Sequence, residues 1–247
     1  MKIKFNLHYY TNWGQQVEVS ISFVTDDGRV KTEIQPMASR DGCNWTCTTI
    51  TMESKQHRTV ALYYVYQIVR GELIERYECN TQPRFVSVSD VNNYEFFDEW
   101  DDEPLQFRLD GISRLHVVPT EVKAPRLSIS RRTIVFRVKA FGLQRGESIA
   151  ILGNNAATGN WDVRRYLPMQ NICGNIFQLT MNADVISGLP IAYKYVIVDI
   201  HAHSMTYWEA GKNRQTGNIE EIEDGKVIIL NDTPVRIIRQ KMYEAKI

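Results

Sequence analysis

Residues 64–80, YVYQIVRGELIERYECN, decide the fold of this chain, because the same pattern returns at residues 193–213 as YKYVIVDIHAHSMTYWEAGKN. Each copy holds two aromatic residues separated by one position, then a turn, then an aromatic residue followed by glutamate. Alternate residues of a strand point to opposite faces of a sheet, so the aromatic pair predicts a strand with one buried face. The second copy has a longer hairpin. The repetition predicts two copies of one β-domain.

Neighbouring segments repeat in the same order. VEVSISF at residues 17–23 parallels SIAILG at 148–153, and GCNWTCTT at 42–49 parallels CGNIFQLT at 173–180. Three matches in order, at nearly one offset, are not easily chance. Short segments rich in Val, Ile, Tyr and Phe recur between turn signals, and long helical periodicity is absent. We therefore expect an all-β protein of two tandem immunoglobulin-like antiparallel β-sandwiches.

The region 97–125 interrupts this rhythm and is typical of a connection between domains. It begins with the acidic run DEWDDEP and ends with the proline-bearing VVPTEVKAP. A chain of 247 residues has room for two modest domains. We expect a first β-sandwich at residues 1–104, a connector at 105–125, and a second β-sandwich with a C-terminal tail at 126–247.

The charge balance excludes whole classes of partner. The 29 lysines and arginines equal the 29 aspartates and glutamates, so the net charge is zero. Nucleic acid and anionic membranes attract basic surfaces, and we expect neither as a partner. The N-terminus MKIKFNLHYYTNW is typical of a strand and lacks the features of a secretory signal, and no segment approaches the roughly 20 apolar residues of a membrane span. We expect a cytoplasmic protein.

The cysteines and histidines give little support for a metal. Cys43 and Cys47 lie four positions apart in an expected strand, without a second ligand pair nearby. Core thiols are the main interpretation, and a metal or redox site is the alternative. His201 and His203 lie in the extra length of a hairpin without a third ligand, which favours an exposed turn. We expect neither a metal nor a cofactor.

The candidate site begins in the stretch LGNNAATGNWDVRRYLPM, residues 152–169, which carries Trp161. The backbone groups of a loop rich in Gly and Asn need water or specific partners, so we expect Trp161 to be exposed on one side. Lys194 lies between Tyr193 and Tyr195. Alternation places Lys194 on the sheet face opposite those tyrosines, which can then anchor the core.

A hairpin arm, YWEAGKNR at residues 207–214, supplies the remaining polar groups. An indole can pack on the apolar face of a pyranose ring, while the hydroxyls at its edge need donors and acceptors. Lysine donates, glutamate accepts, and asparagine does both. This combination suits a neutral sugar chain. The predicted carbohydrate-binding residues are Trp161, Lys194, Trp208, Glu209 and Asn213.

The segment from residue 126 to about 232 resembles a starch-binding domain of carbohydrate-binding module family 20. The motifs that carry the resemblance are Gly159-Asn160-Trp161, Tyr193-Lys194-Tyr195 and Trp208-Glu209 through Asn213-Arg214. The resemblance implies that Trp161 and Trp208 stack on adjacent glucose units of an α-1,4-glucan. It further implies hydroxyl contacts from Lys194 and Asn213, with Glu209 in support.

The second domain departs from the family pattern at two places. Extra residues 154–158 precede Gly159, which we expect to alter the shape of the site. The family's second glucan site uses a tyrosine before a Gly-Glu pair, whereas Arg145 precedes Gly146 and Glu147 here. The substitution counts against a second site in this domain.

The first domain resembles the same family more weakly. Val65 stands where the lysine is expected, Tyr77 replaces the second tryptophan, and no tryptophan-bearing loop follows the strand 17–23. We therefore expect its main sugar site to be lost. Trp13 falls where the family's second site begins, and two interpretations stay open: a second carbohydrate contact, or a partly buried strand end. Trp45 is expected in the core.

Tandem modules of this kind resemble the N-terminal region of cytosolic 4-α-glucanotransferases of glycoside hydrolase family 77, the disproportionating-enzyme type. The resemblance implies non-catalytic binding of α-1,4-glucan, as in starch, glycogen and maltooligosaccharides, beside a C-terminal catalytic barrel. The chain ends at Ile247 without the roughly 250 residues that a barrel needs, so two interpretations stay open: a fragment of a longer enzyme, or a product that is only the binding region.

Two rival functions were weighed against glucan binding. Hydrolysis needs two carboxylates flanking the glycosidic bond. The acids associated with the sugar motifs, Asp162 and Glu209, both adjoin tryptophans, as binding residues would. We therefore expect no catalytic residue in this chain. The alternative is a structural or docking β-sandwich that mediates domain or protein interactions without binding sugar, and for the first domain it stands level with weak glucan binding.

Overall fold

The computed structural model describes residues 1–51, 57–78, 83–89, 92–101, 127–217, 219 and 221–239. These residues form strands joined by turns, which confirms the predicted all-β class. The two short 3-10 helices among them lack the length and apolar character needed to cross a membrane. The predicted connector at 105–125 and the last residues of the predicted C-terminal tail lie outside the described residues.

The chain divides into two compact units. The first unit comprises Met1–Val135 and Ile222–Thr233, and the second comprises Phe136–Glu221 and Pro234–Ile247. The segment Ile222–Thr233 groups with the first unit because its strand pairs there, although its place in the sequence suggested the second domain. The domain boundaries expected from the sequence therefore remain a prediction.

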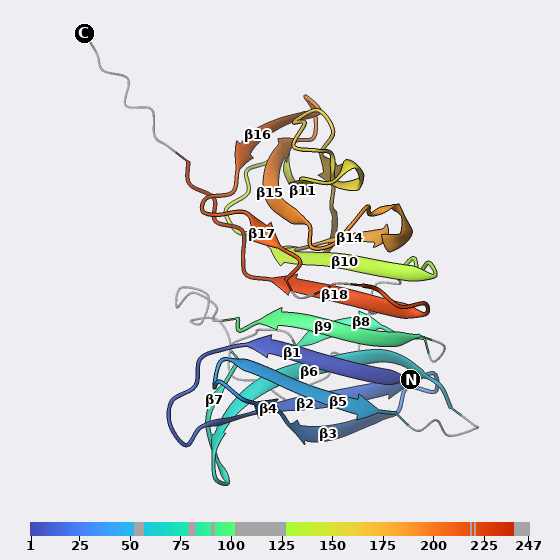
Figure 1. Cartoon of the computed structure of the whole chain (residues 1–247), viewed down its shortest axis with the longest axis vertical. Helices are drawn as coiled ribbons and strands as arrows, with labels where there is room; N and C mark the ends of the chain where they lie inside the picture. The colour runs from blue at the N-terminus through green and yellow to red at the C-terminus, as the bar shows by residue number, and fades with distance from the viewer. Residues whose placement is uncertain are drawn as a thin grey trace. The chain divides into compact units, whose positions relative to one another are not determined.

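The first unit is a sandwich of two sheets (Figure 1). One sheet has the strand order β4-β5-β1-β9-β18, and the other has the order β3-β2-β6-β7 with β8 also paired to β6. Most pairs are antiparallel as expected, but β9 runs parallel to both β1 and β18. The strands are β1 (Lys2–His8), β2 (Gln16–Thr25), β3 (Val30–Pro36), β4 (Ala38–Ser39), β5 (Asn44–Ile50), β6 (Thr59–Arg70), β7 (Leu73–Tyr77), β8 (Arg84–Ser87), β9 (Asn93–Glu99) and β18 (Lys226–Asp232).

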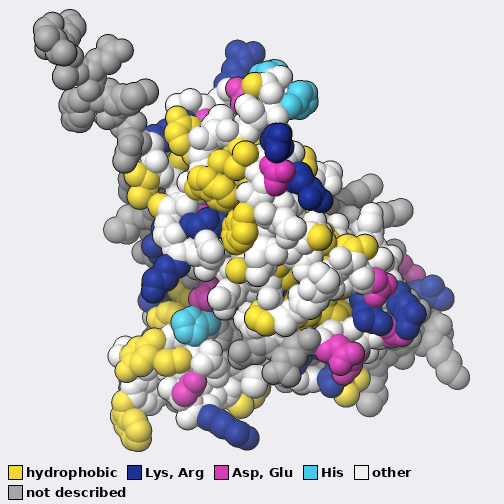
Figure 2. Space-filling model, turned by 45° about the horizontal axis from the view of Figure 1, so that its top comes forward, with side chains coloured by type: hydrophobic (Ala, Val, Ile, Leu, Met, Phe, Trp, Pro, Cys, Tyr) yellow, Lys and Arg dark blue, Asp and Glu magenta, His cyan; other side chains and the backbone are white. Residues whose placement is uncertain are grey.

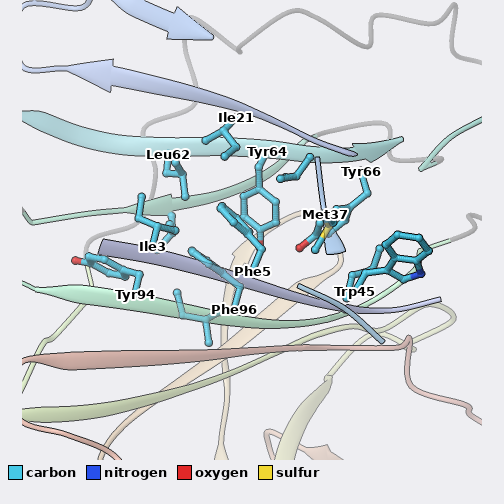
Figure 3. Packing of buried hydrophobic residues seen from close by; sticks show 14 of the residues in the cluster. Ile3, Phe5, Ile21, Met37, Trp45, Leu62, Tyr64, Tyr66, Tyr94 and Phe96 are labelled. Atoms are coloured by element: carbon cyan, nitrogen blue, oxygen red, sulfur yellow. The ribbon is translucent and has the colours of Figure 1, made fainter. Parts of the chain in front are cut away.

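Aromatic side chains from both sheets fill the core of the first unit (Figure 3). The ring of Phe5 on β1 lies 5.0 Å from that of Tyr64 on β6 and 5.1 Å from that of Phe96 on β9. Trp45 is 7% exposed, and its indole N–H donates to the carbonyl oxygen of Tyr9 at 3.2 Å. The expected core position of Trp45 is thus confirmed.

The second unit repeats the strand pairing of the first. Its main sheet has the order β12-β11-β15-β16 with β17 also paired to β15, so β15 occupies the place that β6 has in the first unit. Of its remaining strands, β13 pairs with β14, as β4 pairs with β5 in the first unit. The elements are β10 (Arg132–Lys139), β11 (Glu147–Gly153), η2 (Ala156–Thr158), β12 (Leu167–Pro168), β13 (Gln170–Cys173), β14 (Ile176–Asn182), η3 (Ala183–Val185), β15 (Ala192–Asp199), β16 (Ser204–Trp208) and β17 (Arg214–Gln215).

Strand β15 connects the core of the second unit to its outer surface. Tyr193 and Tyr195 are fully buried, and the ring of Tyr193 lies 5.0 Å from that of Phe136. Lys194 between them is half-buried on the other face of the sheet. The structure confirms the predicted alternation, which places the lysine amine outside the core, where it contacts the arm that follows Trp208.

Candidate carbohydrate-binding site

Trp161 lies in the loop between β11 and β12, with one side of its indole against protein. It packs on an apolar cluster on the outer face of the main sheet, together with Tyr166 and Met205. The residues of this cluster are Ala150, Leu152, Val196 and Val198. Trp161 itself is half-buried, as expected from its turn-rich loop. This packing fixes the ring, and part of the residue remains exposed to solvent.

Trp208 ends strand β16 and is 39% exposed. Its ring centroid lies 6.2 Å from that of Trp161, and the two ring planes are tilted by 53°. The loop after β11 and the end of β16, which are distant in sequence, thus bring the two predicted tryptophans together. Their separation is short enough for neighbouring residues of one sugar chain.

Lys194 fastens the arm that follows Trp208. Its Nζ donates to the carbonyl oxygens of Glu209 at 3.1 Å and of Gly211 at 2.6 Å. An ammonium has three protons, so one remains for a ligand after these two bonds. Asn213 follows on the same arm and is exposed. The lysine therefore holds the arm and has one further N–H with which to bind another partner.

Glu209 lies beneath the arm and is only 3% exposed. Its Oε1 accepts the backbone N–H of Tyr195 at 2.8 Å, and Arg214 donates to both carboxylate oxygens at 2.8–3.0 Å. The Arg214 guanidinium also lies over the ring of Tyr195, 5.0 Å from its centroid. Burial and these partners direct the carboxylate inward, so the expected contribution of Glu209 to carbohydrate binding, in support of Lys194 and Asn213, stays a prediction.

The first unit repeats the buried ion pair of Glu209 and Arg214, an arrangement that we call the clip. Arg84 pairs with fully buried Glu78 at 2.5 Å and lies over the ring of Tyr66, 5.9 Å from its centroid. The backbone N–H of Glu78 donates to the carbonyl of Tyr66, as that of Glu209 does to Tyr195. Burial raises the pKa of Glu78, although Arg84 opposes the shift. The clip is therefore a feature of this strand arrangement, independent of sugar.

The outer face of the first unit lacks the rest of the site. Val65 stands on β6 where β15 has Lys194. The short turn 26–29 joins β2 to β3, where the second unit has the long loop 154–166. On β2 the face carries Glu18, which accepts from the Gln67 amide at 2.7 Å, instead of apolar residues that could support an indole. These differences agree with the expected loss of the main site.

Trp13 is 97% exposed, so the interpretation as a partly buried strand end is wrong. Its carbonyl oxygen accepts from Arg70 Nη1 at 2.7 Å, which holds its turn against the β6–β7 hairpin. Close to this turn, the Gln15 amide donates to Glu75 at 2.7 Å. An exposed indole beside amide, guanidinium and carboxylate groups keeps the carbohydrate interpretation of Trp13 open.

The region of the family's second site in the second unit is already occupied by protein contacts. Arg239 donates to Glu147 Oε1 at 3.0 Å and pairs with Oε2 at 2.5 Å. Burial raises the pKa of Glu147, but the bonds from Arg239 outweigh it and leave the pKa lowered. Together with Arg145 in place of tyrosine, this pairing gives no support for a second sugar site here.

Within the part of the chain that the structure describes, the thiols and histidines singled out from the sequence do not form a group of three close enough to hold a metal ion. Cys43 and Cys47 are half-buried thiols, and burial raises the pKa of Cys47. Cys79 lies outside the described residues. His201 and His203 are exposed in the β15–β16 turn, as expected.

Another group among the described residues has the proximity that a metal site needs. Atoms of Asp26, Asp27 and His57 lie within 4.8 Å of one another. However, Asp27 already accepts from Thr25 Oγ1 at 2.5 Å and forms an ion pair with the Arg29 guanidinium at 3.0 Å. The arginine neutralises the charge that would attract a cation, and we assign no metal to this group.

On the face shown in Figure 2, basic and acidic side chains are interspersed among hydrophobic ones. Asp162, next to Trp161, accepts the backbone N–H of Arg164 at 3.0 Å, and this bond lowers its pKa. The surroundings of Trp161 thus suit a neutral ligand better than a strongly charged one.

Sequence reasoning missed two residues that shape the site. Tyr166 packs against the same apolar cluster as Trp161. Asn155 caps the 3-10 helix η2, which precedes Trp161 in the loop. The signal for Asn155 was present, since an asparagine three residues before a threonine is typical of a capped turn. For Tyr166 no local pattern distinguishes a supporting ring from a core residue.

Comparison with known proteins places the second unit in a carbohydrate-binding context. Residues 131–226 match the family model CBM_20, described as the starch binding domain, which confirms the resemblance inferred from the sequence. The chain is 28% identical over 106 residues to 4-alpha-glucanotransferase DPE2 of Oryza sativa subsp. japonica. This match covers 42% of the chain and 11% of the rice protein, so the chain spans about a tenth of its relative.

The chain also aligns with two solved structures, a glucoamylase and a module of an amylase. The glycoside hydrolase family 15 glucoamylase from Hypocrea jecorina aligns with a TM-score of 0.36 at 20% identity, covering 47% of this chain and 19% of the glucoamylase. The family 20 module of the maltotetraose-forming amylase from Pseudomonas saccharophila STB07 aligns with a TM-score of 0.31 at 18% identity, covering 39% of this chain and 98% of the module.

Proposed function

We propose, from the premise that residues 131–226 match the starch binding domain family, that the second unit binds α-1,4-glucan without catalysis. The observation that carries the proposal is the pair formed by Trp161 and Trp208, with ring centroids 6.2 Å apart. Each indole offers an apolar face to one sugar ring. Lys194 and Asn213 contribute donors and an acceptor at the edge.

The tilt between the two indoles favours a curved glucan chain. Successive rings of a β-1,4-linked chain lie in a flat ribbon, which suits coplanar aromatic platforms. An α-1,4-linked chain turns at each glycosidic bond, so its sugar faces meet surfaces that are inclined to one another. The 53° between the ring planes of Trp161 and Trp208 therefore matches an α-linked ligand. Maltooligosaccharides and the outer chains of starch or glycogen present such ligands.

Within this proposal Glu209 is a positioning residue. Its buried carboxylate holds Arg214 and the backbone of Tyr195, which fixes the start of the arm after Trp208. Because the first unit keeps an equivalent clip without the tryptophans, the clip does not need a sugar to explain it. The sugar-contacting set is then Trp161, Lys194, Trp208 and Asn213.

Trp13 is proposed as a second, weaker contact in the first unit. Its exposed indole meets the first requirement for stacking. A single ring contact predicts a low-affinity site that Trp13→Ala removes. A docking role for the first unit, without sugar binding, is the competing proposal.

The parent protein is proposed to be a 4-α-glucanotransferase of glycoside hydrolase family 77, acting in the cytoplasm. The similarity to the rice 4-alpha-glucanotransferase supports this. A C-terminal catalytic barrel would then perform the glycosyl transfer, while the binding unit raises the local concentration of glucan through tethering. The chain described here supplies binding residues to that arrangement.

Substitution of each tryptophan tests the proposed function. In Trp161→Ala and Trp208→Ala we expect affinity for maltoheptaose to fall by about 2 kcal/mol or more, as for aromatic residues at the centre of an interface. Calorimetric titration measures the change. Tyr77→Ala is the matched control, because Tyr77 occupies in the first unit the place that Trp208 has in the second. The affinity of this variant for maltoheptaose should equal that of the wild type. Unchanged affinity in both tryptophan variants would refute the assignment.

A further inference from the structure

The loop that presents Trp161 has an unusual backbone. Gly159, Asn160 and Trp161 all have positive φ, at 90°, 52° and 58°. Residues other than glycine seldom adopt this left-handed conformation, and each such residue costs free energy unless its surroundings hold it. The direction of the indole therefore depends on contacts elsewhere in the loop.

Asn155 lies at the centre of those contacts and is 7% exposed. Its Oδ1 accepts the backbone N–H of Ala157 at 3.0 Å, and its Nδ2 donates to the carbonyl oxygen of Ser187 at 3.0 Å. Its own carbonyl oxygen accepts the N–H groups of Thr158 at 2.9 Å and Asn160 at 3.0 Å. The residue thus joins the turn η2 to the segment after η3.

The loop then closes on itself with little free space. The N–H of Trp161 donates to the carbonyl oxygen of Gly153 at 2.8 Å, which returns the chain to the end of β11. A Cβ at Gly159 would lie 2.5 Å from the carbonyl oxygen of Arg165. The fully buried Thr158 side chain donates to the carbonyl oxygen of Asn155 at 3.1 Å.

We propose that Asn155 is a positioning residue that pre-organises Trp161 for glucan binding. This inference rests on the proposed function and deepens it. The residues 154–158, which stood out from the sequence as additions to the family pattern, form the capped turn that presets the left-handed backbone. Without the Asn155 side chain the loop samples other conformations, and binding must order it at the expense of affinity. The sugar contacts themselves stay intact.

Two readouts on the whole chain test the proposal. In Asn155→Ala we expect maltoheptaose affinity to fall about tenfold, because the loop must be ordered on binding. We also expect the far-ultraviolet circular dichroism couplet from the Trp161–Trp208 pair to diminish in the absence of sugar. Trp161→Phe identifies that couplet by removing it. Asn155→Ser keeps a capping oxygen and should restore part of both signals.

The matched control is Asn171→Ala. Asn171 is exposed in the β13–β14 hairpin of the same unit, and its side chain donates to the carbonyl oxygen of Gly174 at 2.7 Å. Losing this bond should leave the couplet and the affinity unchanged. A purely structural role for Asn155 would lower the melting temperature without changing the couplet below the transition.

The outcomes separate this inference from the proposed function. A wild-type couplet and wild-type affinity in Asn155→Ala would overturn the positioning role. If Asn155→Ala does not fold, Asn155→Ser takes its place, and unchanged values there would equally contradict the proposal. If the wild type binds no glucan but its couplet is lost in Asn155→Ala, the proposed function fails while the positioning role stands.

Discussion

Glu209 shows at the scale of a single residue how far the sequence could lead. A carboxylate after an exposed tryptophan suits a sugar acceptor, and the same side chain suits a buried ion pair. Two features decide between these roles. One is the direction in which the Glu209 side chain points, and the other is the presence of Arg214 as its ion-pair partner. Trp161, Trp208 and Lys194 were predictable because an indole in a polar loop and a lysine between buried tyrosines have few other placements.

The buried clip leads to a prediction about stability. Glu209→Gln keeps an acceptor for the Tyr195 N–H but leaves Arg214 without its charge partner. We expect a loss of about 2–4 kcal/mol in the free energy of unfolding, measured by thermal or urea denaturation. Glu78→Gln should lower the free energy of unfolding of the first unit by a similar amount, with no change in the affinity for maltoheptaose. Abolished glucan binding in Glu209→Gln at unchanged stability would instead show a direct sugar contact.

At the scale of elements, strand identities followed from the sequence, whereas the partner of β18 did not. The segment KVIIL predicts a strand by composition alone. Its pairing with β9 depends on residues distant in sequence, and it is stabilised by Asn231 Nδ2, which donates to Asp98 at 2.7 Å. No local pattern encodes such a pairing. The repeat of β2, β6 and β7 as β11, β15 and β16 was accessible because its aromatic residues recur in order.

The docking of β18 onto β9 should depend on pH. Burial raises the pKa of Glu95, but bonds from Lys226 at 2.5 Å and Lys4 at 2.9 Å outweigh it and lower the pKa below its usual range. A carboxylate with a lowered pKa stabilises the folded state at neutral pH, and this contribution is lost as the pH falls through the carboxyl range.

Thermal melting as a function of pH measures this dependence. We expect the wild-type melting temperature to fall below about pH 5, and the fall to be shallower in Glu95→Gln, which cannot ionise. Equal pH dependence in the two proteins would assign the acid sensitivity to other carboxylates.

At the scale of the whole molecule, the equal numbers of basic and acidic residues agree with a neutral ligand. The two units share a strand arrangement and a buried ion-pair clip, yet only the second joins them to paired tryptophans and an outward lysine. The fold is thus common to both units, and we propose that the loops and the outer face of β15 determine the specificity of the second. Under the proposed function, the second unit would hold glucan near a catalytic domain.

Calorimetric titration of this chain with maltoheptaose, and with cellohexaose as the β-linked control, tests the central claim most directly. We expect one dominant site per chain for maltoheptaose and no binding of cellohexaose, because the inclined indoles of Trp161 and Trp208 fit a curved sugar chain. Comparable binding of both sugars, or of neither, would contradict it.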